Sequence, residues 1–237
     1  MGDRSLARVE YTRVNAEVAR ATERIVRETE LAILINGRHL ATAMIMPTMA
    51  KEFVIGHLFG QRVIKNVTDI ESITIKGDTA EVTLTEIKDK EQGSPIIHSD
   101  FKVRKEDIFE SVKAILKSEV FTETEAVHSA GLFRRGAEAI CIAEDIGRHN
   151  ALDKVIGYGL LHDIDFSHTL AASTGRQPAE MILRCCQANI PIIATKGVPT
   201  TLAIDIARKA GITIAGLVRG NTMTIYSNPA RIEEIVY

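Results

Sequence analysis

The chain has 237 residues, of which 45% are hydrophobic and 25% charged, and its formal net charge is −2. This balance excludes a global positive field that would attract nucleic acid or an anionic membrane, so local groups would have to bind any anionic ligand. No apolar run approaches the roughly 20 residues of a membrane-spanning helix. The first thirty residues lack the apolar core of a signal peptide, and the three cysteines form no disulfide framework. We therefore expect a cytoplasmic protein.

The first hundred residues favour strands. Strands are predicted at 23–27, 31–35, 38–46, 72–76 and 81–84. Asn36-Gly37 and Gly77-Asp78 supply the turns of two hairpins. One helix is predicted over 49–62, and the polar residues 87–104 predict a linker or an exposed loop.

Strands and helices alternate in the second half. After a helix at 106–117, strands are predicted at 138–143, 169–172, 191–194 and 212–218, with helices that begin near Arg148, Pro178 and Pro199. This order is typical of an α/β layered domain with largely parallel strands. We place a β-rich region with one helix at 1–100 and an α/β ligand-binding domain at 101–237.

Four polar clusters each follow a predicted strand. They span residues 144–150, 173–176, 196–200 and 219–221. The carboxyl ends of parallel strands share one sheet edge, and three clusters lead into helices whose amino ends favour phosphate. The candidate phosphate ligands are Arg148, Arg176, Lys196 and Arg219, with Gly147 and Gly175 allowing close backbone approach. The pattern predicts a bulky, multiply phosphorylated small molecule.

Simpler roles compete with these assignments. Asp145 could cap the following helix or orient His149, and Thr200 could be an ordinary helix cap. His128, in a stretch of small residues, could be a core histidine or part of the site. Cys185 and Cys186 are adjacent on a predicted helix and point about 100° apart, which disfavours a disulfide or a shared metal and favours a structural role. The sequence contains no Cys-x-x-Cys, so a zinc deaminase site is not expected.

Several blocks together resemble the FdhD family of formate dehydrogenase accessory proteins. The blocks are Val127-His-Ser-Ala130, Glu144-Asp-Ile-Gly-Arg-His-Asn-Ala-Leu-Asp-Lys-Val-Ile-Gly157, Thr174-Gly-Arg176, Pro199-Thr-Thr-Leu-Ala203 and Gly216-Leu-Val-Arg-Gly220. The resemblance extends from about Thr48 to Tyr226 and is most specific after His128.

The resemblance implies a cytidine-deaminase-like α/β domain beside a smaller β-rich domain, in a cytoplasmic homodimer. It implies that sulfur passes from a cysteine desulfurase to molybdenum in the bis-pterin guanine dinucleotide cofactor, before that cofactor enters formate dehydrogenase. No nucleic acid, membrane or resident metal is expected. The cofactor-binding residues would be His128, Asp145, Gly147, Arg148, His149, Gly175, Arg176, Lys196, Thr200 and Arg219, and a guanine nucleotide would be a partial mimic of the cofactor.

The chain departs from the family where sulfur is carried. The family has a Cys-x-x-Cys loop between the second hairpin and the next helix, whereas residues 92–101 contain no cysteine here. Three hypotheses therefore remain. The protein could bind the pterin cofactor and assist formate dehydrogenase, with sulfur transfer lost, delegated to a partner, or moved to Cys185 or Cys186. It could be a cofactor-binding chaperone or regulator without sulfur transfer. It could instead be an acid–base enzyme that uses His128, Asp145 and His149 on a nucleotide-like substrate.

Overall fold

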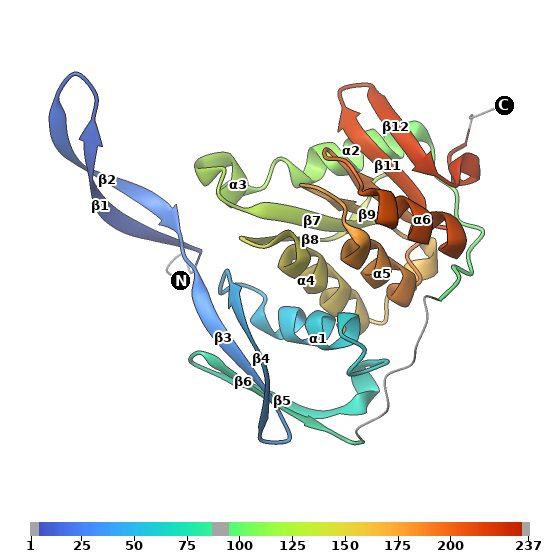
Figure 1. Cartoon of the computed structure of the whole chain (residues 1–237), viewed down its shortest axis with the longest axis horizontal. Helices are drawn as coiled ribbons and strands as arrows, with labels where there is room; N and C mark the ends of the chain where they lie inside the picture. Colours follow the sequence, from blue (N-terminus) through green and yellow to red (C-terminus); the bar gives the residue numbers. More distant parts are fainter. Residues whose placement is uncertain (1–4, 87–94, 234–237) are drawn as a thin grey trace.

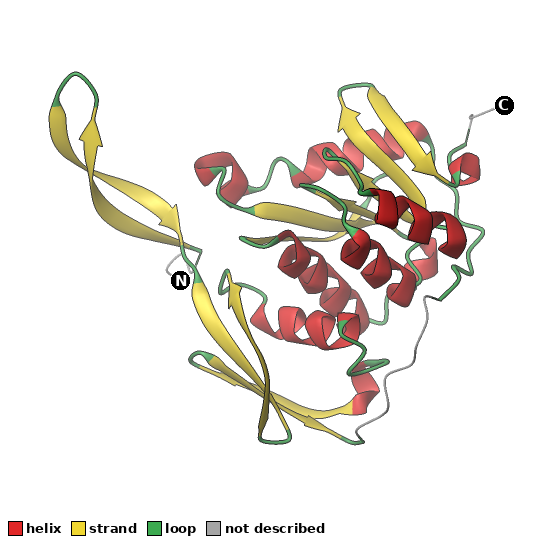
Figure 2. Ribbon diagram, in the orientation of Figure 1, coloured by secondary structure: helices red, strands yellow, loops and turns green. Residues whose placement is uncertain are grey.

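In the computed structural model, the described residues are 5–86 and 95–233, and they form three β-sheets and six α-helices (Figures 1 and 2). The protein is therefore a mixed α/β protein, as the alternation of strands and helices predicts. None of the described helices has the length and apolar character needed to cross a membrane.

A two-stranded hairpin projects from the body of the molecule (Figure 1). It consists of β1 (Leu6–Val14) and β2 (Val18–Val26), paired antiparallel along their whole length. Leu6 and Val26 at its base pack near Met46, and the rest of the hairpin is largely exposed. The sequence predicted only the end of β2.

The second sheet has the order β4-β3-β6-β5. Its strands are β3 (Thr29–Ile35), β4 (Arg38–Ile45), β5 (Ile70–Lys76) and β6 (Thr79–Leu84). Both predicted hairpins are confirmed: Asn36 and Gly37 adopt φ of 49° and 76°, as a tight two-residue turn requires. The central strands β3 and β6 are parallel.

A close helix crossing joins this region to the rest of the chain. The helix α1 (Ala50–Gly60) packs against α4 (Arg148–Leu161), and a Cβ atom added at Gly56 would lie 1.8 Å from the carbonyl oxygen of Asp153. A Cβ at Gly157 would likewise lie 1.9 Å from the carbonyl oxygen of Glu52. The two backbones can approach this closely only because both positions are glycine.

The third sheet has six strands in the order β12-β11-β10-β9-β7-β8. Its strands are β7 (His128–Phe133), β8 (Ala139–Asp145), β9 (Leu170–Ser173), β10 (Ile192–Thr195), β11 (Thr213–Arg219) and β12 (Thr222–Ser227). Strands β9, β10 and β11 are parallel, and β7 is antiparallel to both β8 and β9. It follows that β8 points the same way as β9, so the four clusters predicted to share an edge do share it.

Helices cover both faces of this sheet. The remaining ones are α2 (Lys105–Ile115), α3 (Glu119–Thr124), α5 (Ala179–Ala188) and α6 (Thr201–Ala210). The central strands place alternate residues on opposite faces, so the sheet lies between two hydrophobic cores. Leu170 and Ile192 pack with α2 in one core, whereas Ala171 and Ile193 pack with α1, α4 and α5 in the other. The short helix α3 was not predicted.

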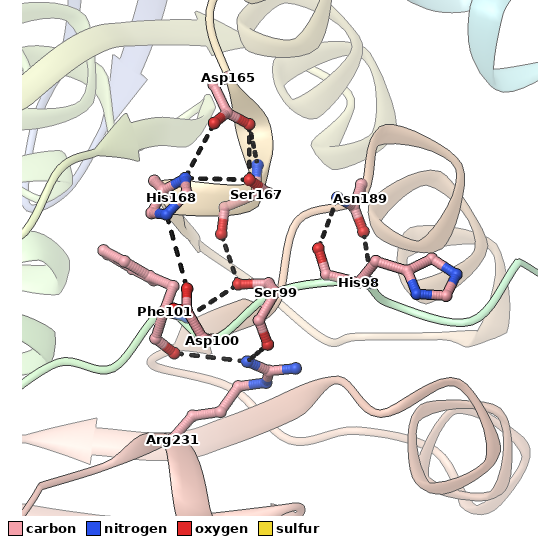
Figure 3. A network of polar contacts seen from close by, with 9 residues as sticks. All are labelled: His98, Ser99, Asp100, Phe101, Asp165, Ser167, His168, Asn189 and Arg231. Atoms are coloured by element: carbon pink, nitrogen blue, oxygen red, sulfur yellow. Dashed lines mark hydrogen bonds and ion pairs between the residues drawn. The ribbon is translucent and has the colours of Figure 1, made fainter.

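The segment predicted as a linker or an exposed loop lies partly outside the described residues, at 87–94. The part that is described, 95–103, is irregular but packs on the amino edge of the six-stranded sheet (Figure 3). The Ile97 N–H donates to the carbonyl of Ala210 at 2.8 Å, and Val103 is fully buried. The prediction of a loop is confirmed, and five of its nine side chains are exposed; it was incomplete because Ile97, Phe101 and Val103 are buried.

Candidate functional site

A cavity of about 410 Å³ opens at the carboxyl edge of the six-stranded sheet. Its polar lining includes His128, Thr174, Gly175, Lys196, Gly197 and Arg219. Its apolar lining includes Leu116, Phe121, Val127 and Ile146. Four of the residues proposed from the sequence, namely His128, Gly175, Lys196 and Arg219, therefore line one cavity of a size suited to a small molecule.

Direct contacts hold the loops beneath this cavity together. The Thr195 hydroxyl donates to the carbonyl of Gly175 at 2.7 Å, and the Leu217 N–H donates to the carbonyl of Gly197 at 2.8 Å. A Cβ atom at Gly197 would lie 2.2 Å from the Gly175 carbonyl oxygen, so only glycine fits there. The loops after β9, β10 and β11 thus form one unit.

His128 enters the site from β7, whose antiparallel direction brings its first residue to this edge. The ring Nδ1 lies 3.0 Å from the Thr174 hydroxyl, which also accepts the N–H of Ser129 at 3.0 Å. Burial lowers the pKa of His128, and the charge of Arg148 lowers it further, while Asp145 acts in the opposite direction. His128 is therefore a neutral hydrogen-bonding group at neutral pH.

The four predicted phosphate ligands have no acidic partners among the described residues: no carboxylate pairs with Arg148, Arg176, Lys196 or Arg219. The Nε of Arg148 is buried and has no hydrogen-bond partner among the described residues, and its Cδ would lie 3.6 Å from a Cβ added at Gly175. Arg148 therefore borders the cavity, whereas the exposed Arg176 does not line it. Unpaired cations around a cavity are what an anionic ligand requires.

Asp145 faces the protein interior. It is fully buried and pairs with the equally buried Lys154 at 2.7 Å. Its Oδ2 also accepts the Met46 N–H at 3.1 Å, and its Oδ1 accepts from Gly147 N–H at 3.0 Å and from the Asn150 amide at 2.9 Å. Asp145 thus fixes the loop before α4 and connects it to β4.

His149 lies near α5 and is not bonded to Asp145. Its Nε2 is 3.4 Å from a carboxylate oxygen of Glu180, although the geometry is not that of a hydrogen bond. Burial lowers the pKa of His149, with Arg184 and Arg148 adding to the effect. The structure therefore does not bring Asp145 and His149 together as a pair.

The other proposed residues sit in local structural positions. Gly147 is the residue before α4, and Thr200 caps α6 by accepting the Ala203 N–H at 3.3 Å. Sequence reasoning missed two buried residues near this edge. These are Lys154 and Gln177, whose side-chain amide is fully buried without a hydrogen-bond partner. Their only sequence signal is a polar residue close to an apolar stretch.

None of the three cysteines resembles a reactive thiol. Cys185 and Cys186 are buried on α5, and burial raises the pKa of Cys186 to about 11 and that of Cys185 further. Burial also raises the pKa of Cys141 to about 12. Within the described ranges, no group of three or more His, Cys, Asp or Glu side chains could hold a metal ion.

The fold and cavity define a mixed α/β protein with a cation-rimmed ligand cavity at the carboxyl edge of its sheet. The FdhD/NarQ family model matches residues 26–95 and 84–233. The chain belongs to this family.

Relatives match over nearly the whole length. The sulfur carrier protein FdhD of Methanothermobacter thermautotrophicus is 33% identical, over 94% of this chain and 97% of the relative. The protein of the same name from Sulfolobus acidocaldarius is 34% identical, over 87% of this chain and 90% of its own. The crystal structure of a formate dehydrogenase accessory protein from Desulfotalea psychrophila has a TM-score of 0.85 and 28% identity, covering 96% of this chain and 99% of its own.

Proposed function

We propose that this chain is a formate dehydrogenase accessory protein that binds the molybdenum bis-pterin guanine dinucleotide and promotes its sulfuration. The names of its relatives support the accessory role. The observation that carries the binding site is the group of cations at the carboxyl-edge cavity: Lys196 and Arg219 line it, Arg148 borders it, and none has a carboxylate partner among the described residues. We further propose a cytidine-deaminase-like topology for the α/β part, a cytoplasmic homodimer, and a cysteine desulfurase as the source of sulfur.

Different residues of the cavity would contact different parts of the cofactor. Arg219 and Lys196 would hold phosphate oxygens, with the arginine able to bind two oxygens at once. The apolar wall would cover one face of a ring. Neutral His128 would contribute a hydrogen bond without adding charge. The cofactor is the cargo of the protein and arrives with its own metal chemistry.

A second candidate function is cofactor binding without a persulfide on this chain. Persulfide formation needs an accessible thiolate, yet the pKa of each cysteine is raised by burial. Residues 92–101 contain no cysteine. Under this candidate the chain would be a chaperone or regulator of the cofactor that takes no part in sulfur transfer. The acid–base enzyme is less well supported, because both Asp145 oxygens are bonded within the protein and Asp145 does not contact His149.

Calorimetric titration with GDP tests the site. We expect binding by the wild type, and a loss of about ten-fold or more in affinity for Arg219→Ala or Lys196→Ala, because each removes a charged hydrogen bond to phosphate. Arg134→Ala, on the opposite edge and paired with Glu138 at 3.0 Å, is the control. Unchanged affinity in Arg219→Ala and Lys196→Ala would show that the ligand binds elsewhere.

Sulfur labelling tests whether this chain carries the sulfur itself. The protein is incubated with a cysteine desulfurase and radiolabelled cysteine, and reductant-labile label on the chain is counted beside a known carrier. Because Cys185 and Cys186 are buried and the pKa of the partly exposed Cys141 is raised to about 12, we expect no such label. Label that disappears in the Cys185→Ser/Cys186→Ser variant would instead show that the carrier cysteine has moved to α5.

A further inference from the structure

A second cavity, of about 490 Å³, neighbours the first at the carboxyl edge. It lies between α2 and the turn from β11 to β12. The two cavities share three lining residues, Leu116, Lys196 and Arg219. Lys196 and Arg219, here called the cation ridge, therefore stand between two hollows, and neither has a carboxylate partner among the described residues.

Both cavities also have apolar lining residues. In the first they include Phe121, Val127 and Ile146, and in the second Phe109, Val112 and Val218. Each cavity thus combines an apolar lining with the two cations of the ridge. Rings favour the apolar walls and phosphates favour the ridge, so the matching ligand has two ring systems joined by a diphosphate.

Each cavity also contains one glutamate, Glu125 in the first and Glu110 in the second. Guanine and pterin both present a 2-amino-4-oxo edge, whose neighbouring N–H donors suit a carboxylate that accepts two hydrogen bonds. Glu110 pairs with Lys113 at 3.1 Å, but both side chains are more than half exposed. Such a pair is weak and leaves the carboxylate able to accept from a ligand.

We propose that one pterin guanine dinucleotide unit spans both cavities. Its diphosphate rests on the cation ridge, and Glu110 and Glu125 each accept from the 2-amino-4-oxo edge of one ring. This inference rests on the proposed function and adds to it a second binding compartment, beneath the β11–β12 turn.

Diguanosine 5′,5′-diphosphate is the probe, because it carries the same edge at both ends. Calorimetric titration compares it with GDP, which fills one cavity, and with diadenosine 5′,5′-diphosphate, whose rings lack that edge. We expect the diguanosine compound to bind at least about ten-fold more tightly than either comparison ligand, because linking two ends makes the second contact intramolecular.

Two single variants test the compartments. Glu110→Gln and Glu125→Gln should each weaken binding of the diguanosine compound about ten-fold, since one charged acceptor becomes an amide. GDP should keep its affinity within about two-fold in at least one of them, because its single ring can use the other cavity. Glu106→Gln is the matched control, an exposed glutamate on α2 that lines neither cavity.

The outcomes separate the spanning mode from the proposed function. If GDP binds but the diguanosine compound binds no more tightly, or Glu110→Gln leaves its affinity unchanged, the spanning mode is wrong while the cofactor site stands. If the wild type binds neither guanine compound, both are wrong. A gain shown equally by the diadenosine compound would overturn the role of the two glutamates.

Discussion

Lys154 illustrates how a single side chain can contradict its sequence context. It lies between Asp153 and Val155 on α4, yet it is fully buried and donates to the carbonyls of Met46 and Glu144 at 3.0 Å each. Burial lowers its pKa, and the nearby charge of Asp145 acts against that shift. The burial of Lys154 and its hydrogen bonds could not be predicted from the sequence, because one of its partners lies 108 residues away.

For Asp145 and His149 the sequence suggested a contact that the structure does not form. Their spacing in sequence suggested a carboxylate that orients an imidazole. In the structure Asp145 points into the protein toward Lys154, and His149 points toward Glu180 on α5. Closeness along the chain does not set side-chain direction at a strand-to-helix turn, where each residue faces a different neighbour.

Acidification should destabilise the protein through its two half-buried histidines. The pKa values of His128 and His149 are lowered from 6.5, so between each lowered pKa and 6.5 the unfolded chain binds more protons than the folded one. The free energy of unfolding therefore rises with pH through that window and falls on acidification. We expect the free energy of unfolding, measured by urea denaturation, to fall less between about pH 7.5 and about pH 5.5 in His128→Gln and in His149→Gln than in the wild type.

The exposed His39→Gln is the control for removing an imidazole at the surface. Identical pH profiles for the wild type and both half-buried variants would mean that other groups produce the acid sensitivity.

At the scale of elements, alternation in the sequence located most strands correctly. Strands β3 to β6 and β8 to β11 were predicted because most of their sequences alternate apolar and polar residues or form a short apolar run. Strand β1 was missed because its exposed positions carry charges and only Leu6 is buried. The irregular structure of segment 95–103 was predicted, but the burial of Ile97, Phe101 and Val103 was not, because their neighbours lie far along the chain.

The crossing of α1 and α4 leaves no space for an added side-chain atom at its glycines. We expect Gly157→Ala to lower the free energy of unfolding by about 2–3 kcal/mol, because overpacking a close contact costs about 1–3 kcal/mol and backbone is the obstacle here. The midpoint temperature of thermal unfolding, Tm, should fall by roughly 4–12 °C, because each kcal/mol lowers Tm by about 2–4 °C in a protein of this size.

Gly60→Ala is the matched control on α1. The nearest atoms to its added methyl group would belong to side chains, those of Arg184 at 3.3 Å and Asp153 at 3.5 Å, and we expect a change within about 1 kcal/mol. If Gly157→Ala is as mild as this control, the helices can separate and the contact is not a constraint on the fold.

At the scale of the whole molecule, the six-stranded sheet separates two functional edges. The carboxyl edge holds both cavities, and its position was predictable because β8 to β11 all end in polar clusters. The amino edge holds the segment 95–103, bonded to Asn189, Ser167 and Arg231 (Figure 3). The sequence did not reveal this second edge, since Asn189 follows α5, Ser167 and Arg231 lie in two short 3-10 helices, and Ser167 contributes only its main-chain carbonyl.

Arg231 is the anchor that best tests whether these edges are independent. Its guanidinium donates to the carbonyls of Ser99 at 2.7 Å and Phe101 at 3.4 Å, and its Nε donates to the carbonyl of Gly211 at 3.3 Å. Arg231→Ala removes these three hydrogen bonds to main-chain carbonyls. Because the site is half-exposed, we expect the free energy of local unfolding to fall by only about 1–2 kcal/mol. Amide hydrogen exchange should accelerate at Ile97 and Val103.

The same variant should keep the GDP affinity of the wild type within about two-fold. Even the four-residue strand β9 spans roughly 13 Å, and its buried side chains form a rigid layer between the edges. Faster exchange with unchanged affinity would show that the docked segment and the cavity respond separately. A ten-fold fall in affinity would show that the sheet transmits changes from one edge to the other, because Arg231 lines neither cavity.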